Sequence, residues 1–395
     1  MIVVSIIFWI CVFAVLQTYL LFPLSLRILY RIKSKNKEQP APSNTEQPVS
    51  ILMAAYNEEK VIEDKIESIF KSNYPINLIE VWVGSDNSTD KTNELLQQLQ
   101  QKYPQLHPVF FNERNGKIKI INQLVQKANA DILIITDANV LFDPNTMVEL
   151  CSSIKEEKVG LVDTRMMHSG LQSDGISKQE NMYISNEVKT KYYEGQLWGC
   201  MMGPFGGCYA VKKSLFVPVP ENFLVDDFFI NMQVLSKGYK AVNNPKAIVF
   251  EDVSNNLKHE FNRKIRIATG DFQNLHYFKI FTIKNLFTPI GFCFTSHKIL
   301  RWFTPLIMIT AFIALTFLAI NNIPLYYYLW LAGIALLFLV LLERIVSHMN
   351  IHIGALRLLT HFFYMNLALL IGFFRFLKGV KSSVWNPTPR LQAKK

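Results

Sequence analysis

The distribution of charge along the 395 residues constrains the fold more than any other feature of this sequence. Residues 2–24, 302–320 and 325–342 contain no Asp, Glu, Lys or Arg. An apolar run of about 20 residues is long enough to cross a bilayer as a helix. We therefore expect an N-terminal membrane anchor over residues 1–26 and a C-terminal membrane region over residues 302–377, with one N-terminal and two to three C-terminal transmembrane helices.

A fourth apolar run, residues 358–374, is interrupted by His361 and Asn366. Cationic residues follow the first run, so the positive-inside rule places the large central domain in the cytoplasm. A full fourth crossing would carry the basic tail, residues 378–395, to the other side, against the same rule. We therefore expect residues 358–374 to lie in the membrane interface or to re-enter. The expected location is the plasma (inner) membrane, with several crossings and a cytoplasmic tail.

The net charge of +10 lies largely beside the apolar runs. Contact with anionic lipid headgroups explains it better than nucleic-acid binding. The expected partner is therefore the lipid bilayer and not a nucleic acid.

The five cysteines show no metal-ligand spacing, and a cytoplasmic domain needs no disulfides.

Between residues 47 and 278, strand patterns alternate with amphipathic helical patterns. This alternation predicts a mostly parallel sheet covered by helices, which is the Rossmann-like α/β class. Residues 279–301 are expected to form an interfacial helical region. The expected strands are 49–55, 78–84, 109–111, 131–136 and 159–166, and the expected helices are 58–71, 90–101, 117–128 and 228–237, with another from Pro144.

Acidic residues occur at two places that are typical of ligand-binding or catalytic sites. The apolar run 132–135 is followed by Thr136-Asp137-Ala138-Asn139, so a buried strand presents Asp137 at the edge where open α/β sheets bind ligands. Asp226-Asp227 precedes an amphipathic stretch about ninety residues later. One acid that holds a metal diphosphate and one that accepts a proton are what a sugar transfer from a nucleotide to a hydroxyl requires.

Three polar turns precede Asp137 in the expected sheet. They are Ala54–Glu59, Gly84–Asp90 and the segment Arg114-Asn115-Gly116-Lys117, which brings two cations and a glycine to a helix start. Each turn alone is ordinary loop or capping sequence. Their order at the strand ends of one sheet favours a nucleotide diphosphate as the ligand.

With these motifs, residues 47–275 resemble the family 2 glycosyltransferases of GT-A fold. The similarity is greatest to the membrane-embedded branch that includes cellulose, hyaluronan and poly-N-acetylglucosamine synthases. The resemblance implies a nucleotide-sugar donor bound by Ala55, Tyr56, Asn57, Glu58, Asp86, Arg114 and Lys117.

The resemblance also implies a metal site at Asp137 and Asn139, which match the family's Asp-x-Asp motif. Asn139 can offer a carbonyl oxygen to a cation, although it supplies no charge. The implied cofactor is Mg²⁺ or Mn²⁺ held by oxygen ligands and by the diphosphate.

The acceptor side is implied by three further matches. Gly206 and Gly207 match the glycine-rich acceptor segment, and Asp226-Asp227 matches the acidic pair whose second member is the base. Arg263 and Arg266 stand where the synthases have Gln-x-x-Arg-Trp, a motif that contacts the diphosphate and the acceptor end. Its Gln and Trp are replaced here, which speaks against processive synthesis but not against transfer. Trp385–Arg390 resembles a C-terminal element of the same branch.

The expected function is therefore that of an inverting, membrane-bound glycosyltransferase. It would transfer a sugar from a nucleotide-sugar, with a UDP-sugar as the favoured donor, to a glycan or lipid-linked acceptor. The expected process is exopolysaccharide or cell-envelope glycan synthesis. An export or polymerisation protein is a conceivable partner. One alternative is a non-processive transferase to polyprenyl phosphate or diacylglycerol. Another is a catalytically degenerate scaffold subunit of a polysaccharide export complex.

Overall fold

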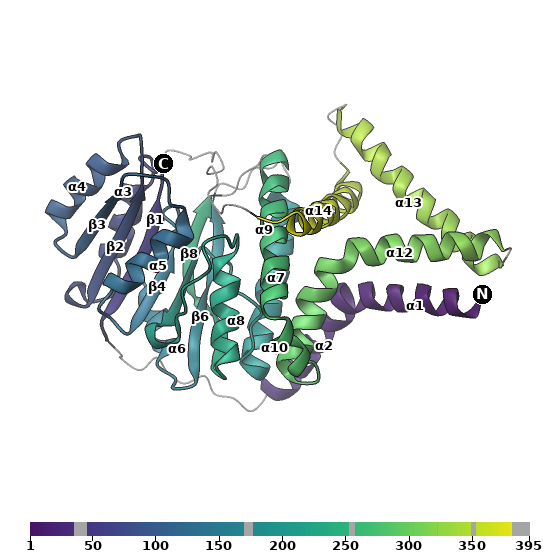
Figure 1. Cartoon of the computed structure of the whole chain (residues 1–395), viewed down its shortest axis with the longest axis horizontal. Coiled ribbons are helices and arrows are strands. Elements are labelled where there is room, and N and C mark those ends of the chain that lie inside the picture. Colours follow the sequence, from purple (N-terminus) through teal and green to yellow (C-terminus); the bar gives the residue numbers. More distant parts are fainter. Residues whose placement is uncertain (35–45, 170–176, 253–256, 322, 349–352, 381–395) are drawn as a thin grey trace. The chain divides into compact units, whose positions relative to one another are not determined.

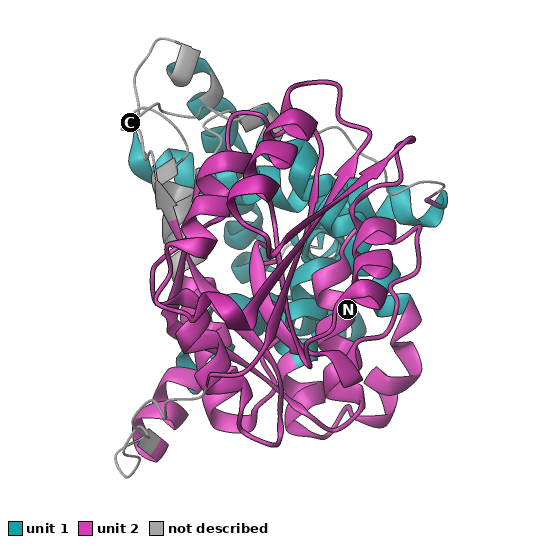
Figure 2. Cartoon of the chain, turned by 90° about the vertical axis from the view of Figure 1, so that its left-hand side faces the viewer, with its two compact units in different colours: residues 1–25, 258–276, 294–379 teal, residues 26–257, 277–293, 380–395 magenta. Residues whose placement is uncertain are grey.

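The computed structural model describes residues 1–34, 46–169, 177–252, 257–321, 323–348 and 353–380 (Figure 1). The chain forms two compact units (Figure 2). The sheet unit comprises Leu26–Leu257, Tyr277–Cys293 and Val380–Lys395, and the helical unit comprises Met1–Ser25, Lys258–His276 and Phe294–Gly379. The basic tail from residue 381, with Trp385–Arg390, lies outside the described residues.

The sheet unit is built on one eight-stranded sheet of order β3-β2-β1-β4-β7-β6-β8-β5. Helices α5 and α6 pack on it, α5 against β1 and β2, and α6 against β6 and β8. The strands are β1 Val49–Ala55, β2 Ile79–Asp86, β3 Leu106–Phe111, β4 Ile132–Thr136, β5 Leu141–Phe142, β6 Val159–Ser169, β7 Cys208–Lys212 and β8 Lys240–Asp252; the helices between them are α3 Ile62–Phe70, α4 Thr92–Lys102, α5 Lys117–Lys127, α6 Thr146–Ile154, α7 Ser177–Trp198 and α8 Asp226–Ser236.

The first half of the sheet, β1 to β4, is parallel throughout. Val49 lies opposite Ile79 on one side and Ile132 on the other. β-Branched residues fill these strands, and Ile51, Val81 and Ile134 are fully buried. The carboxyl ends of the four strands therefore meet at one edge, as the sequence predicts.

The second half is mixed, which the sequence did not predict. β7 runs antiparallel to both β4 and β6, while β8 runs parallel to β6. β8 contains Asn243-Asn244-Pro245, residues that are typical of turns, and its pairing with β6 has a register shift. That composition explains why no strand was expected there. The predicted Rossmann-like α/β class is confirmed.

Within the part of the chain that the structure describes, four helical stretches are long and apolar enough to cross a membrane: Ile2–Lys33, Pro289–Ile320, Pro324–Glu343 and Gly354–Leu377. The chain thus has the composition of a membrane protein, with one N-terminal and three C-terminal candidate spans. The helices that make up these stretches are α1 Ile2–Leu16, the π-helical turn Gln17–Leu21, α2 Phe22–Ser34, α11 Pro289–Cys293, the π-helical turn Phe294–Ile299, α12 Leu300–Ile320, α13 Pro324–His348 and α14 Gly354–Leu377.

Two of these stretches differ in extent from the sequence-based expectation. The helix expected at 302–320 starts at Pro289, so only α10, Lys279–Lys284, stands as a separate helix in the expected interfacial region. The weak run 358–374 lies inside α14, a single helix of 24 residues. The expected interfacial or re-entrant placement of residues 358–374 stays a prediction.

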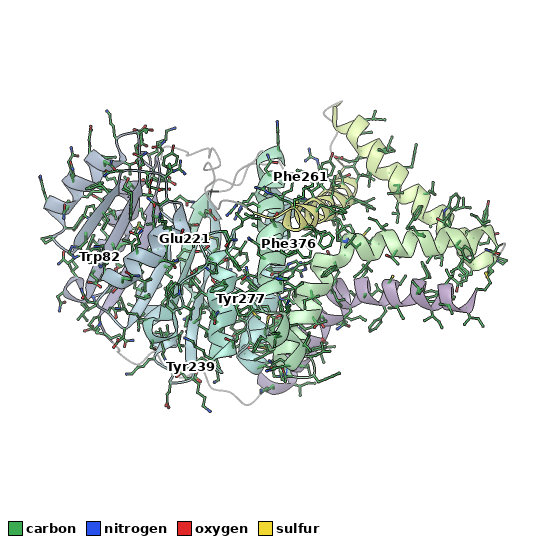
Figure 3. All side chains as sticks on the ribbon, in the orientation of Figure 1. Trp82, Glu221, Tyr239, Phe261, Tyr277 and Phe376 are labelled. Atoms are coloured by element: carbon green, nitrogen blue, oxygen red, sulfur yellow. The ribbon has the colours of Figure 1, made fainter. Side chains whose placement is uncertain are left out.

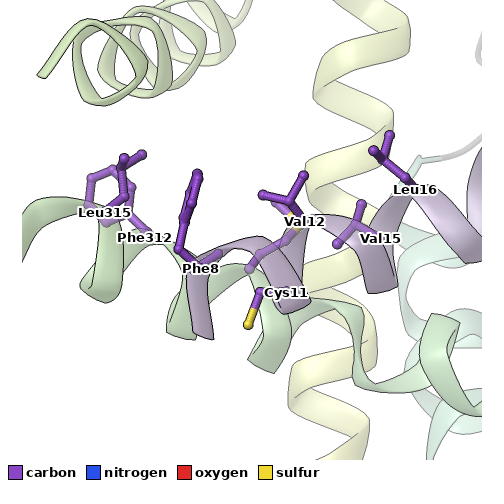
Figure 4. A pocket seen from close by; sticks show the side chains of 9 residues that line it. Phe8, Cys11, Val12, Val15, Leu16, Phe312 and Leu315 are labelled. Atoms are coloured by element: carbon purple, nitrogen blue, oxygen red, sulfur yellow. The ribbon is translucent and has the colours of Figure 1, made fainter. Parts of the chain in front are cut away.

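Helices α1 and α12 pack against each other in the helical unit. Phe8, Leu315 and Leu318 form part of their buried apolar cluster. A hollow of about 270 Å³ lies between the two helices, lined only by apolar side chains and Cys11 (Figure 4). The contact between the two helices is therefore apolar, which suits helices that pack in lipid.

Helix α9, Leu257–Tyr277, belongs largely to the helical unit, although the sequence placed it in the catalytic domain. Phe272 packs edge-on against Phe303 and Phe373, with ring centroids 5.4 Å and 5.1 Å away. A methyl group on Gly372 of α14 would come within 2.5 Å of the Ala268 side chain. This close approach of α9 and α14 explains the grouping.

Candidate active site

The first two strand ends are joined by hydrogen bonds between their loops. Asn57 adopts a left-handed conformation (φ 53°), and its side-chain oxygen accepts a hydrogen bond from the Thr89 backbone N–H at 2.8 Å. The backbone N–H of Glu58 donates to the Thr92 hydroxyl at 2.9 Å. The predicted nucleotide segment, Ala55 to Glu58, therefore forms one surface with the loop after β2.

Asp86, at the end of β2, organises the turn that precedes α5. Its carboxylate accepts hydrogen bonds from Asn115 N (2.6 Å), Gly116 N (3.1 Å) and Arg114 Nε (3.1 Å). Gly116 has φ 80°, a conformation that glycine adopts without strain. The Arg114 guanidinium lies 3.3 Å from the centroid of the Tyr56 ring. The structure thus brings together three of the predicted nucleotide residues, Tyr56, Asp86 and Arg114, with Asp86 directed at the loop.

Lys117, the first residue of α5, joins the two acidic motifs. Its ammonium lies 2.8 Å from Asp137 Oδ1 and 3.6 Å from Asp226 Oδ2. Burial alone would lower the pKa of Lys117, but the charges of Asp137 and Asp226 outweigh it and hold the pKa above its ordinary value. Lys117 therefore stays cationic beside two carboxylates that are ninety residues apart in sequence.

Asp227 lies in the first turn of α8 and accepts a hydrogen bond from the Phe228 backbone N–H at 2.8 Å. Burial, followed by the charge of Asp226, raises the pKa of Asp227 to about 6, while Lys117 opposes the shift. A carboxylate with a pKa near the working pH is suited to proton transfer. Helix α8 is held by Phe229, whose ring packs on the ring of Tyr277 with the centroids 5.0 Å apart. Tyr277 is labelled in Figure 3.

The glycine-containing segment touches both acidic motifs. Gly206 has φ 84°, and a Cβ there would lie 2.5 Å from Asp227 Oδ2, so only glycine fits. The Gly207 carbonyl accepts hydrogen bonds from Asp137 N (2.9 Å) and from the Thr136 hydroxyl (3.0 Å). The structure therefore places the predicted acceptor segment between the predicted metal residue and the predicted base.

The donor atoms at Asp137 can take part in a cation site but cannot complete one. The Asn139 amide nitrogen donates to Glu251 Oε1 at 3.2 Å, which leaves its oxygen as the end able to bind a cation. Among the residues that the structure describes, no group of three His, Cys, Asp or Glu side chains is arranged to hold a metal. A divalent cation would need further oxygens from the nucleotide diphosphate.

Arg263 and Arg266 lie on α9, within the helical unit. Arg263 contacts Glu260 at 3.5 Å on the same helix. Their expected contact with the diphosphate stays a prediction.

Sequence reasoning missed several buried polar residues of the sheet unit. Lys65 on α3 is fully buried and donates to the Thr136 hydroxyl (3.0 Å) and to the Val140 carbonyl, so it supports the turn that presents Asp137. Burial lowers the pKa of Lys65 to about 7. The available signal was its place on the same helical face as Ile62 and Ile69. Asp163, Lys191 and Glu251 were missed as well.

Comparison with known proteins bears on this geometry. Residues 50–217 match the family described as Glycosyl transferase family 2. These residues are a family 2 glycosyltransferase domain. The predicted family and enzyme class are thereby confirmed.

A solved structure shares the fold of nearly the whole chain. It is a mannosyltransferase of Pyrobaculum calidifontis in complex with GDP-Man and Mn²⁺, with a TM-score of 0.69 and 22% identity. The match covers 94% of this chain and 99% of that one. The predicted GT-A fold is confirmed.

Curated relatives are named as glycosyltransferases of differing substrate. A dolichyl N-acetyl-α-D-glucosaminyl phosphate glucuronosyltransferase of Methanococcus voltae is 25% identical over 64% of this chain and 81% of its own length. A β-monoglucosyldiacylglycerol synthase of Nostoc is 34% identical, but the match covers 35% of this chain and only 30% of that protein. A poly-β-1,6-N-acetyl-D-glucosamine synthase of Staphylococcus aureus is 23% identical over 60% of this chain and 58% of its own length.

Proposed function

We propose that the protein is an inverting glycosyltransferase that moves a sugar from a nucleotide-sugar to a hydroxyl of a glycan or lipid-linked acceptor. The observation that carries the proposal is the convergence of Lys117, Asp137 and Asp226 next to Asp227, whose pKa is raised to about 6. A cation flanked by carboxylates receives a diphosphate with its metal, and a carboxylate that titrates near neutral pH receives a proton.

Asp227 is the proposed base. Its ionised carboxylate takes the proton of the acceptor hydroxyl as the oxygen attacks the anomeric carbon and the bond to the diphosphate breaks. Gly206 lies against the same carboxylate and keeps one side of it free of side chains. Because no second carboxylate serves as nucleophile, a single displacement inverts the anomeric configuration.

The donor is held by residues of the first half of the sheet. Tyr56 and Asp86 contribute to the nucleotide surface, while Arg114 and Lys117 neutralise the diphosphate that leaves. Asp137, with the Asn139 amide oxygen, would hold Mg²⁺ or Mn²⁺, which supplies Lewis-acid stabilisation of the leaving diphosphate. Arg263 and Arg266 are proposed as additional diphosphate contacts.

A single transfer to a lipid-linked acceptor is the version of this function that the sequence favours. Ile267 stands where the processive synthases have the Trp of Gln-x-x-Arg-Trp. The Methanococcus relative is named for a dolichyl phosphate that already carries a sugar, and the Nostoc relative for a diacylglycerol glucoside. These names support polyprenyl-phosphate-linked or diacylglycerol lipids as acceptor classes. Use of a UDP-sugar, transfer within exopolysaccharide synthesis and a partner export protein are finer proposals.

The deciding experiment measures nucleotide release by the detergent-purified full chain against a panel of UDP- and GDP-sugars. Each donor is tested alone, with polyprenyl phosphate, with dioleoylglycerol and with oligosaccharides. Release that rises with a lipid supports the single transfer, and a polymer product supports a synthase. A chain that binds nucleotide but releases none with any donor would instead be a scaffold subunit.

The proposed orientation places the sheet unit in the cytoplasm and the turn between α12 and α13 outside. Asn321 and Glu157 are exposed, whereas the five native cysteines are buried, so the unmodified chain serves as the blank. We predict that a membrane-impermeant thiol reagent added to whole cells labels Asn321→Cys and spares Glu157→Cys. Protection of Ala393→Cys is expected if α14 does not cross, and its labelling would show a fourth crossing. Labelling of Glu157→Cys would reverse the orientation.

A further inference from the structure

Two buried charges that the proposed mechanism does not use lie behind the glycine-containing segment. Asp163 on β6 is fully buried, and Lys191 on α7 is 3% exposed. Charged side chains are rarely enclosed to this degree, because each loses its hydration. The burial of both charged side chains therefore needs a structural or functional explanation.

Both side chains hold Phe205, the residue before Gly206. The Phe205 backbone N–H donates to Asp163 Oδ1 at 3.3 Å, and the Lys191 ammonium lies 3.8 Å from the centroid of the Phe205 ring. Asn243 on β8 donates to Asp163 Oδ2 at 3.4 Å and orients the carboxylate in turn. Phe205 is thus fixed at its backbone by β6 and at its ring by α7.

The start of the same segment is fixed in a similar way. The Met202 backbone N–H donates to Glu194 Oε2 at 3.0 Å, and the Asn231 amide donates to the Met201 carbonyl at 3.0 Å. Glu194 and Asn231 are both fully buried. Polar side chains from α7, α8 and β6 therefore hold the connection between α7 and β7.

The connection between α7 and β7 contains Gly206, which lies against Asp227. Because a Cβ at Gly206 would already meet Asp227 Oδ2 at 2.5 Å, a small shift of Phe205 changes the surroundings of the base. The charges are coupled as well. Burial raises the pKa of Asp163 to about 7, with Lys191 opposing and the charge of Asp227 adding to the shift. Lys191 also opposes the rise in the pKa of Asp227 that burial and Asp226 produce.

We propose that Asp163 and Lys191 are positioning residues that hold Phe205 and Gly206 against Asp227, so that an acceptor hydroxyl, and not water, faces the base. The inference rests on the proposed function, because it assigns a task to the acceptor segment of a transferase. Neither side chain is a catalytic residue, since each acts through Phe205.

The first test does not depend on the identity of the substrates. Amide hydrogen exchange is measured on the full chain for the peptide covering residues 200–209, in Asp163→Asn and Lys191→Met. We expect exchange there to accelerate by about tenfold or more, as local opening becomes easier, with no change in the β1 peptide. Ser50→Ala is the matched control, because Ser50 is a fully buried polar residue of β1 that bonds Glu80 and the Ala130 backbone. Unchanged exchange at 200–209 in both variants would overturn the proposal.

The second test separates positioning from a merely structural role. It uses the donor that gives turnover in the panel and compares transfer to the lipid acceptor with hydrolysis of the donor by water. Misplacing the segment should lower the ratio of transfer to hydrolysis by about tenfold or more while the donor KM changes by less than about twofold. Lys191→Arg should recover much of the ratio, because it keeps the charge over the ring. An equal fall in both reactions would assign Lys191 to stability alone and contradict the proposal.

A third variant covers the case in which Asp163→Asn does not fold. Phe205→Leu keeps the backbone N–H and removes the ring. Combined with Lys191→Met, it should add little to either single change, since both remove the same contact. Full additivity would contradict the contact. Absence of turnover with every donor would contradict the proposed function. The hydrogen-exchange experiment would then still test whether Asp163 and Lys191 hold residues 200–209 in place.

Discussion

The two halves of the sheet use their carboxylates differently. In the parallel half, Asp86 accepts three hydrogen bonds from the loop before α5 and acts as a fixed organiser of that loop. In the mixed half, Asp163 is fully buried and Asp227 is partly buried, and burial raises their pKa values to about 7 and about 6. This contrast fits the proposed function, in which the first half binds the donor and the second handles a proton. The predictions below test this division.

Replacing the proposed base should have the largest effect. We expect Asp227→Asn to lower transfer by roughly 10²–10⁴-fold, the usual contribution of a positioned base, and to leave nucleotide affinity nearly unchanged. Nucleotide release and equilibrium binding measure the two quantities separately. Turnover close to that of the unmodified protein would remove Asp227 from the mechanism.

Crowding the base should come next. Gly206→Ala places a methyl group 2.5 Å from Asp227 Oδ2, which must move away, and a displacement of about 1 Å at a reacting group can lower the rate roughly 10²-fold. Gly238→Ala is the matched control, because Gly238 has φ 81° with nothing within 4 Å of an added Cβ. Both variants should lose about 1–2 kcal/mol of stability from the left-handed backbone, but only Gly206→Ala should lose transfer. Equal activity of the two variants in nucleotide release would refute the close approach.

A change in the parallel half should affect binding first. We expect Asp137→Ala to weaken nucleotide binding in Mg²⁺ or Mn²⁺ by roughly 10–100-fold or more, since even outer-shell partners of a metal contribute that much. Without metal the affinity should hardly change, and EDTA should stop turnover of the unmodified protein. Full activity in EDTA would show that the diphosphate leaves without a metal.

The smallest expected effect is that of pH on transfer. Because the base must be ionised and the pKa of Asp227 is about 6, transfer should fall as pH drops through 6 and be about tenfold lower at pH 5 than on the plateau. The charged groups that act on Asp227 are Asp226, Lys117, Lys191 and Asp163. Asp226→Asn removes a negative neighbour and should move the inflection to lower pH. An inflection that stays in place would assign the titration to another group.

The same division explains what the sequence could predict. Asp86 and Asp137 each follow an apolar strand, and Asp227 opens a helix, so local pattern was enough to select them. No local sequence pattern singles out Asp163 or Lys191, because their proposed role arises only when β6 and α7 enclose Phe205. Helix α9 reads as a basic amphipathic helix, yet Phe272 and Ala268 pack it against α12 and α14. Such contacts between segments that are far apart in the chain have no sequence signature.

The raised pKa of Asp227 has a consequence for the history of this fold. A folded-state pKa above the unfolded value of 3.8 means that folding disfavours the ionised form, so Asp227 begins to destabilise the protein as pH rises above 3.8 and does so fully above a pH of about 6. Selection for stability alone would replace it with asparagine or an apolar residue, whereas Lys117, which compensates two neighbouring acids, would be kept even in an inactive descendant. The variant that removes the proposed base should therefore also be the one that melts at a higher temperature near neutral pH.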